Sequence, residues 1–263
     1  MNPLFPKISF FIFALAALLS LVYLVFQKKA LIRAGQRLVL LAFLFQGVGF
    51  ALYIAHVGLP FLRESADSYL FCAWVLAGLF LVIGLKYRLE VAGSLFLPAI
   101  LILYTLAHFT HEAYGGERGL MDSPWASIHI VFAFLALASF FLSFLLGLLF
   151  LLQEIQLKRK KILKIFERLP SLEGLDQLHY KALTVGFVLL TFGIISGSAW
   201  AKSVKGVYFF DDPRQLWSIV AWLVYAFFFQ VRFSAGWRGR RGVLLSLIGF
   251  MVILFTFLEV RHA

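Results

Sequence analysis

Five of the six histidines lie near the same end of the long apolar stretches of this 263-residue chain. These five are His56, His108, His111, His129 and His262. Neutral imidazole is the commonest metal ligand in proteins, and an ionisable group inside or at the edge of a membrane is a functional hypothesis by default. Two of these histidines, contributed by different helices, could bind a haem iron on its two axial sides.

Each of these histidines taken singly also has an ordinary explanation. An imidazole ring tolerates the headgroup region of a membrane and can bond a backbone carbonyl. The sequence therefore leaves open whether His56, His108 and His111 are iron ligands or packing residues. The sixth histidine, His179, lies at the opposite end of the apolar stretches and is expected to be only a polar residue.

The composition is that of an integral membrane protein. Hydrophobic residues make up 62% of the chain, charged residues only 14%, and the mean hydropathy is +0.92. Uncharged runs of about 20 residues match the thickness of a bilayer core, where only a helix satisfies its own backbone. We expect an all-α, polytopic membrane bundle, a single membrane domain over residues 1–263, with about eight spans near 8–27, 38–61, 70–86, 91–109, 127–152, 182–201, 215–231 and 243–260.

The basic residues predict the orientation of the chain. Most of its 24 lysines and arginines follow the first, third, fifth and seventh spans. The positive-inside bias then places these loops in the cytoplasm and both termini outside it. Basic loops that lie against anionic membrane lipid explain the net charge of +11 without a nucleic-acid partner. We expect a multi-pass protein of the bacterial cytoplasmic (inner) membrane.

Small residues follow one face of the fifth and the sixth spans, which favours close helix packing. His129 lies at the outer end of the first of these strips. The strips consist of Ala136, Ser139, Ser143 and Gly147 in the fifth span, and of Gly186, Gly193 and Gly197 in the sixth.

Several classes of function are disfavoured. The chain has one cysteine, Cys72, which rules out an internal disulfide or Cys-x-x-Cys site. No nucleophile and base constellation and no phosphate-binding glycine loop is present, so we do not expect an enzyme in its own right. A solute transporter is also disfavoured, because no paired broken helices and no carboxylate at mid-membrane depth occur.

The outer segment between the sixth and seventh spans is rich in aromatic residues. It runs from Trp200 to Ser218 and reads WAKSVKGVYFFDDPRQLWS. Such a segment can lie on the membrane interface and stack against a planar ligand. Interfacial anchoring alone also accounts for aromatic residues at this depth.

This segment resembles the tryptophan-rich, or WWD, loop of the membrane cytochrome c assembly family, which includes the CcsA, CcmC and HemX types. The resemblance covers a core of about residues 125–260 and is closest to the small HemX-like members. It is looser in the N-terminal half, at Ser68-Tyr69, Trp74 and Leu97-Pro98. The supporting matches are Leu169-Pro170-Ser171-Leu172-Glu173 with Asp176, Gly186-Phe187, Leu189-Leu190-Thr191, Gly193, Gly197, Asp212-Pro213, Trp217-Ser218, Trp222, Tyr225, Gly236 to Arg241, and Gly249-Phe250.

The resemblance implies a haem-handling component of cytochrome c biogenesis that presents haem b at the extracytoplasmic face. His129 then matches the first axial ligand, and His262, just after the last span, is the candidate for the second. The implied partners are haem, apocytochrome c, and a membrane or extracytoplasmic assembly protein. The haem-facing side chains would be those of Trp200, Tyr208, Phe209, Asp212 and Trp217.

The loop departs from the family pattern at several positions. Lys205-Gly206 replaces a Trp-Gly pair, and Phe209 and Asp211 stand where further tryptophans are usual. These departures leave three interpretations open: weaker haem binding, recognition of a haem propionate by Lys205, or a relative that no longer carries haem. The last is the alternative: a non-catalytic, HemX-like membrane regulator or scaffold of haem biosynthesis. Its working surface would be the basic cytoplasmic segments Lys158 to Lys164 and Gly236 to Arg241.

Overall fold

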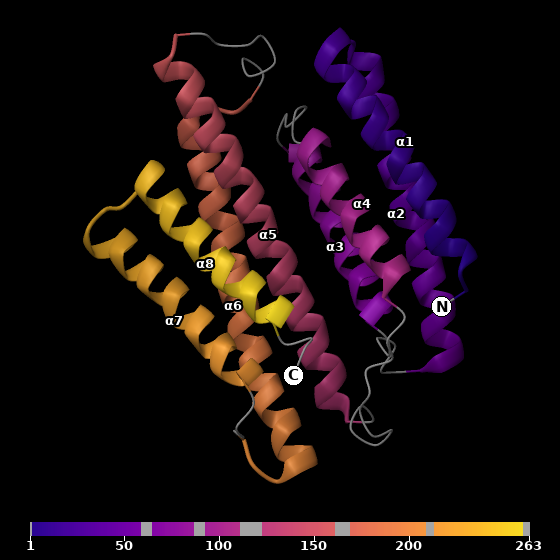
Figure 1. Cartoon of the computed structure of the whole chain (residues 1–263), viewed down its shortest axis with the longest axis vertical. Helices are drawn as coiled ribbons and strands as arrows, with labels where there is room; N and C mark the ends of the chain where they lie inside the picture. Colours follow the sequence, from indigo (N-terminus) through magenta and orange to yellow (C-terminus); the bar gives the residue numbers. More distant parts are fainter. Residues whose placement is uncertain are drawn as a thin grey trace. The chain divides into compact units, whose positions relative to one another are not determined.

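A computed structural model describes residues 2–58, 65–86, 93–110, 123–160, 169–208 and 213–259. Within these ranges the regular structure consists of eight α-helices, shown in Figure 1. Each predicted span falls largely or wholly in one helix, so the all-α fold class is confirmed. The helices are α1 (Leu4–Phe26), α2 (Lys29–Val57), α3 (Ser65–Lys86), α4 (Gly93–Phe109), α5 (Pro124–Lys158), α6 (Leu172–Lys205), α7 (Pro213–Ser234) and α8 (Arg240–Glu259).

The chain is a multi-pass membrane protein. Among the described residues, six helices are long and apolar enough to cross a membrane, namely α1, α2, α3, α5, α6 and α7. A seventh apolar helix, α4, is shorter, with 17 residues. The orientation of the termini stays a prediction.

Two helices are much longer than the spans predicted for them. α5 has 35 residues and α6 has 34, whereas about 20 residues suffice to cross the hydrocarbon core. The Ser171 hydroxyl caps the start of α6 by accepting a hydrogen bond from the Gly174 amide at 3.2 Å. The helix ends at Lys205, and the φ of +76° at the following Gly206 suits a glycine after a helix. Hydropathy detects only the lipid-facing part of such a helix, so it underestimates the length.

The described helices form two compact units, with α1–α4 in the first and α5–α8 in the second. In the first unit the Trp74 indole of α3 stacks on Phe43 of α2 at 4.8 Å between ring centroids. Its Nε1 also donates to the Phe43 carbonyl at 2.9 Å. The prediction that residues 1–263 form a single membrane domain stays a prediction.

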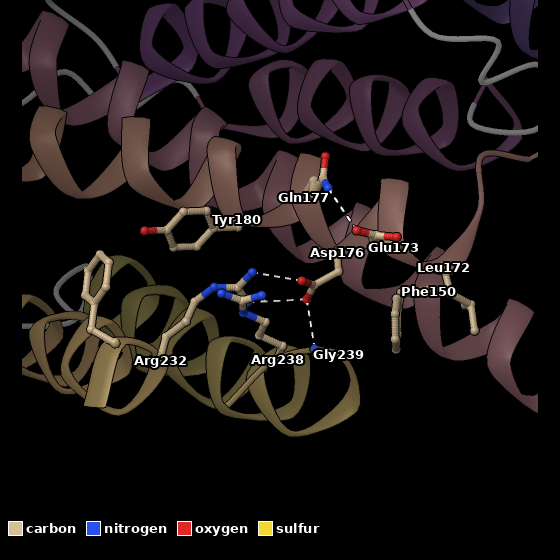
Figure 2. A pocket seen from close by; sticks show the side chains of 10 residues that line it. Phe150, Leu172, Glu173, Asp176, Gln177, Tyr180, Arg232, Arg238 and Gly239 are labelled. Carbon is tan, nitrogen blue, oxygen red and sulfur yellow. Dashed lines mark hydrogen bonds and ion pairs between the residues drawn. The ribbon is translucent and has the colours of Figure 1, made fainter. Parts of the chain in front are cut away.

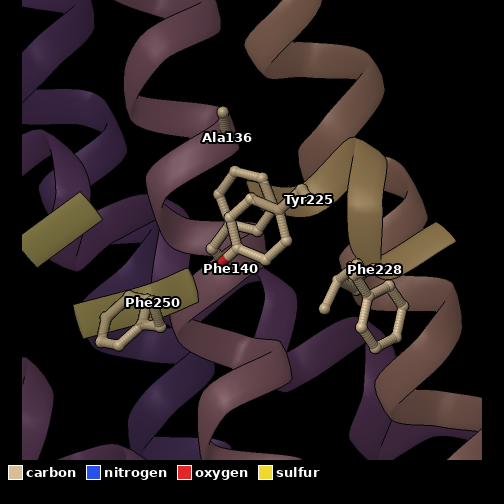
Figure 3. Packing of buried hydrophobic residues seen from close by; sticks show 6 residues of the cluster. Ala136, Phe140, Tyr225, Phe228 and Phe250 are labelled. Carbon is tan, nitrogen blue, oxygen red and sulfur yellow. The ribbon is translucent and has the colours of Figure 1, made fainter. Parts of the chain in front are cut away.

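An aromatic stack lies at the centre of the second unit. The rings of Phe140 in α5 and Tyr225 in α7 are nearly parallel, 7° apart, with centroids separated by 4.2 Å (Figure 3). Leu183 of α6 and Phe250 of α8 belong to the same buried cluster. A Cβ at Gly186 would lie 2.9 Å from the Phe140 ring. The small-residue face of α6 therefore admits a bulky ring from α5, as close packing requires.

A buried ion pair joins three helices at the N-terminal end of α6. The Asp176 carboxylate accepts from Arg232 of α7 at 2.8 and 3.3 Å, and from the Gly239 amide before α8 at 3.0 Å (Figure 2). The Arg232 guanidinium also lies 4.2 Å from the Tyr180 ring centroid. Both charged side chains are only 10% exposed, so each compensates the other's loss of water.

The substitution Arg232→Gln is expected to destabilise the second unit by about 3–5 kcal/mol, because it leaves the Asp176 carboxylate buried without a cation. The matched control is Arg241→Gln, which removes the same charge from an exposed position at the start of α8. Thermal unfolding in detergent measures the stability of both variants. Equal unfolding temperatures for the two variants would show that the pair does not hold the helices.

Candidate functional site

His129, in the second turn of α5, bonds directly to the backbone of α6. Its Nδ1 lies 2.7 Å from the Gly193 carbonyl oxygen. A carbonyl oxygen only accepts, so Nδ1 must carry the proton and donate it. In the neutral ring the other nitrogen, Nε2, is then unprotonated and holds the lone pair. Among the described residues, no side chain or backbone group hydrogen-bonds Nε2.

Glycines of α6 make room for this ring. A Cβ at Gly197 would lie only 2.8 Å from His129 Nδ1 and 3.0 Å from its Cε1. A Cβ at Gly193 would meet nothing nearer than 3.8 Å. Gly197 is thus required where the imidazole packs, whereas Gly193 supplies the carbonyl acceptor. The small-residue strip of α6, which the sequence predicts for helix packing, therefore also packs against the His129 ring.

Trp200, one turn after Gly197, also packs near the imidazole. The His129 and Trp200 rings stack with centroids 6.0 Å apart and planes 28° apart. Close by, the hydroxyls of Ser123 and Ser203 lie 3.1 Å apart and link the beginning of α5 to the end of α6. The ring is therefore fixed by a hydrogen bond, a glycine contact and a tryptophan.

The two other described residues of the predicted site lie further along the chain. Tyr208 follows the end of α6 and is 56% exposed, and the Lys202 ammonium lies 4.8 Å from its ring centroid. Trp217 is partly buried in the first turns of α7. Phe209, Asp212 and His262, which complete the predicted site, lie outside the described residues. The structure thus brings His129 and Trp200 together, and the remainder of the site stays a prediction.

The other described histidines have different surroundings. His56 is exposed in the last turn of α2. His108, in α4, lines a cavity of about 640 Å³ in the first unit together with Lys7 and Asp67. His111 lies outside the described residues. No group of three or more histidine, cysteine or acidic residues arranged for a metal ion occurs in the described part of the chain.

His179 is more than a polar residue at a helix end. Its side chain is fully buried, and its Nε2 lies 2.6 Å from the Ser246 hydroxyl of α8. Ser143 of α5 donates to the His179 carbonyl at 3.1 Å. Sequence inspection missed this contact between α5, α6 and α8. The one feature of the sequence that pointed to this contact is Ser143, which lies on the predicted small-residue face of the fifth span.

The comparison with protein families assigns the chain to a family. Residues 62–263 match the model of the family described as cytochrome C assembly protein. The chain belongs to the cytochrome c assembly protein family. The match includes all described residues of α5–α8 and begins before α3, so it extends further toward the N-terminus than the core of 125–260 predicted from the sequence.

Similar proteins named cytochrome c biogenesis protein CcsA occur in several organisms. That of Chlamydomonas reinhardtii is 30% identical over 208 residues, which are 76% of this chain and 58% of the relative. That of Trieres chinensis is 27% identical over 231 residues, 76% and 74% of the two chains. That of Parasynechococcus marenigrum is 44% identical over 94 residues, which are 36% of this chain and 31% of the relative. This chain thus spans less than two thirds of the Chlamydomonas relative.

These relatives confirm the resemblance to the cytochrome c assembly family. They carry the name of the CcsA type, so they give no support to the more specific likeness to HemX-like members.

Replacing Gly197 is expected to displace the His129 ring. Gly197→Ala puts a methyl group 2.8 Å from Nδ1, and overpacking of this kind costs about 1–3 kcal/mol. Gly193→Ala is the matched control, since its methyl group meets nothing closer than 3.8 Å. Thermal unfolding in detergent compares the two. An equal effect of both variants would contradict the close seat of the imidazole on Gly197.

Proposed function

We propose that this protein is a membrane haem-handling component of cytochrome c biogenesis, which presents haem at the extracytoplasmic face for cytochrome assembly. The observation that carries the proposal is the hydrogen bond from His129 Nδ1 to the Gly193 carbonyl. Histidines that bind metals usually donate a hydrogen bond from the N–H of the other ring nitrogen to a carbonyl or carboxylate, which fixes the tautomer and orients the ring. His129 already has that arrangement, with Nε2 left as the iron-binding atom.

The surroundings of the ring also fit haem. The Trp200 ring stacks with the imidazole at 6.0 Å between centroids, and we expect this contact to limit rotation of the ring. Tyr208, which is exposed, and Trp217, together with Phe209 and Asp212, supply the aromatic and polar contacts of our proposed site. In our proposal His129 and His262 would hold the iron of a bound haem, and that haem would be the group passed on in cytochrome assembly. We propose that this haem is haem b, which is held without thioether bonds.

The proposed partners follow from the family. The relatives are named cytochrome c biogenesis proteins, so we propose apocytochrome c as the recipient of the haem, and a membrane or extracytoplasmic assembly protein as a further partner. We also propose the bacterial cytoplasmic membrane as the location, and a role as assembly factor rather than as an enzyme. The relatives carry the CcsA name and give no support to the HemX-like regulator without haem, so that alternative is not proposed further.

The test is the absorption spectrum of the detergent-purified protein, oxidised and then reduced with dithionite. The wild-type chain is expected to show a Soret band and sharp reduced bands, and His129→Ala is expected to lose them while remaining folded. His56→Ala, which removes an exposed histidine of the first unit, is the control and should keep its haem.

In the same series, His262→Ala is expected to change the spectrum from that of a six-coordinate to that of a five-coordinate iron. Haem content in His129→Ala equal to that of the wild type would refute the assignment of His129. A wild-type protein that takes up no haem at all, even when haem is added, would refute the proposed function.

A further inference from the structure

A second feature of α6 lies at its other end. A cavity of about 630 Å³ opens among the end of α5, the first turns of α6, the end of α7 and the turn before α8 (Figure 2). Its volume is in the range of small-molecule binding sites, about 300–1,000 Å³. The cavity lies wholly in the second unit, and none of its lining residues belongs to the proposed haem site.

Two of the four charged residues in the cavity wall neutralise each other. The carboxylate of Asp176 and the guanidinium of Arg232 form the ion pair described above. Both oxygens of Asp176 accept hydrogen bonds, Oδ1 from Arg232 and Gly239 and Oδ2 from Arg232. This pair therefore forms a fixed part of the wall and contributes no net charge to a ligand.

The other two charged residues, Glu173 and Arg238, have opposite signs. Both are exposed, and neither forms an ion pair with another described residue. The Glu173 carboxylate accepts a hydrogen bond from the Gln177 side-chain amide of the same helix, with 3.4 Å between Nε2 and Oε1. In Figure 2, Glu173 lies on α6 and Arg238 on the turn before α8, so the two charges come from different walls. The cavity thus offers one cation and one anion.

Apolar residues complete the wall. Phe150, Leu172 and Phe233 line the cavity, and the Phe233 side chain is 77% exposed. The sequence places this level at the edge of the membrane, because the predicted spans end at residue 152, just after Phe150, and at residue 231, just before Phe233. By the positive-inside bias, this edge faces the cytoplasm. A ligand that fits must therefore be both charged and apolar.

We propose that this cavity binds the headgroup of a zwitterionic phospholipid of the phosphatidylethanolamine type. Arg238 bonds the phosphate, Glu173 bonds the ammonium, and the acyl chains lie along Phe150 and Phe233. An anionic phospholipid would leave the Glu173 carboxylate unpaired beside a second negative charge. A soluble phosphate would leave the apolar wall uncovered. Basic pockets at the cytoplasmic ends of membrane helices are known to bind lipid headgroups, and the added acidic residue here changes the preference.

Native mass spectrometry of the full chain, incubated with equal amounts of phosphatidylethanolamine and phosphatidylglycerol, tests the proposal. The wild-type protein is expected to retain phosphatidylethanolamine preferentially. Arg238→Gln should lower that retention about tenfold, the scale of one charge-assisted hydrogen bond. Arg241→Gln removes the same charge from a neighbouring residue that does not line the cavity, and should behave as the wild type. Retention unchanged in Arg238→Gln, or lost equally in Arg241→Gln, would overturn the proposal.

The role of Glu173 has its own test in the same mixture. Glu173→Gln should abolish the preference for phosphatidylethanolamine over phosphatidylglycerol, because phosphatidylglycerol no longer meets a carboxylate. Glu154→Gln, the same substitution at a carboxylate outside the cavity, should keep the preference. A wild-type protein that binds both lipids equally would contradict the zwitterionic headgroup. Elution volume on size exclusion confirms that each variant is folded.

A third arm separates a lipid from a free phosphate. Inorganic phosphate at millimolar concentration is expected to leave the bound phosphatidylethanolamine in place. Phosphate that binds the delipidated protein through Arg238 while no phospholipid is retained would overturn the lipid assignment. None of these measurements involves haem, so they succeed or fail independently of the proposed function.

Discussion

The hydrogen bond between the His129 ring and the Gly193 carbonyl sets the geometry on which the proposed site depends. A polar ring between two membrane helices must find a partner, because water is scarce there and an unpaired polar group costs several kcal/mol. Here the partner is a backbone oxygen, so it cannot rotate away. The same bond decides which nitrogen carries the proton, and therefore which one can reach a metal. Gly197 and Trp200 then fix the plane of the ring.

α6 connects the proposed haem site to the cavity at its other end. Its C-terminal half accepts the hydrogen bond of His129, and its middle packs against Phe140 at Gly186. In its first turns Asp176 forms the ion pair with Arg232. Each of these contacts involves a neighbouring helix of the second unit. A helix held at three levels keeps its carbonyls in place, which a preorganised ligand requires. The buried ion pair and the aromatic stack therefore serve the site although neither touches it.

The sequence predicted the helical spans well, since hydropathy reports what a bilayer requires. It could not predict the ends of α5 and α6, because polar turns remain helical outside the lipid. It marked Gly193 and Gly197 as packing residues, but not as the acceptor and the seat of an imidazole. The partner of Asp176 lies 56 residues away in Arg232, a separation that no local pattern reveals. Trp222 and Tyr225, which supported the family resemblance, pack against Phe187 and Phe140 and thus stabilise the unit.

The central claim is that the His129 imidazole is an axial ligand of haem iron and not only a packing residue. The most direct measurement is chemical rescue: haem is added to the purified His129→Gly protein with and without free imidazole, and the Soret region is recorded. Our account predicts little haem binding without imidazole and a restored six-coordinate spectrum when imidazole fills the space between Gly193 and Trp200. Haem binding that is unaffected by the substitution, or that imidazole does not restore in a folded protein, would contradict it.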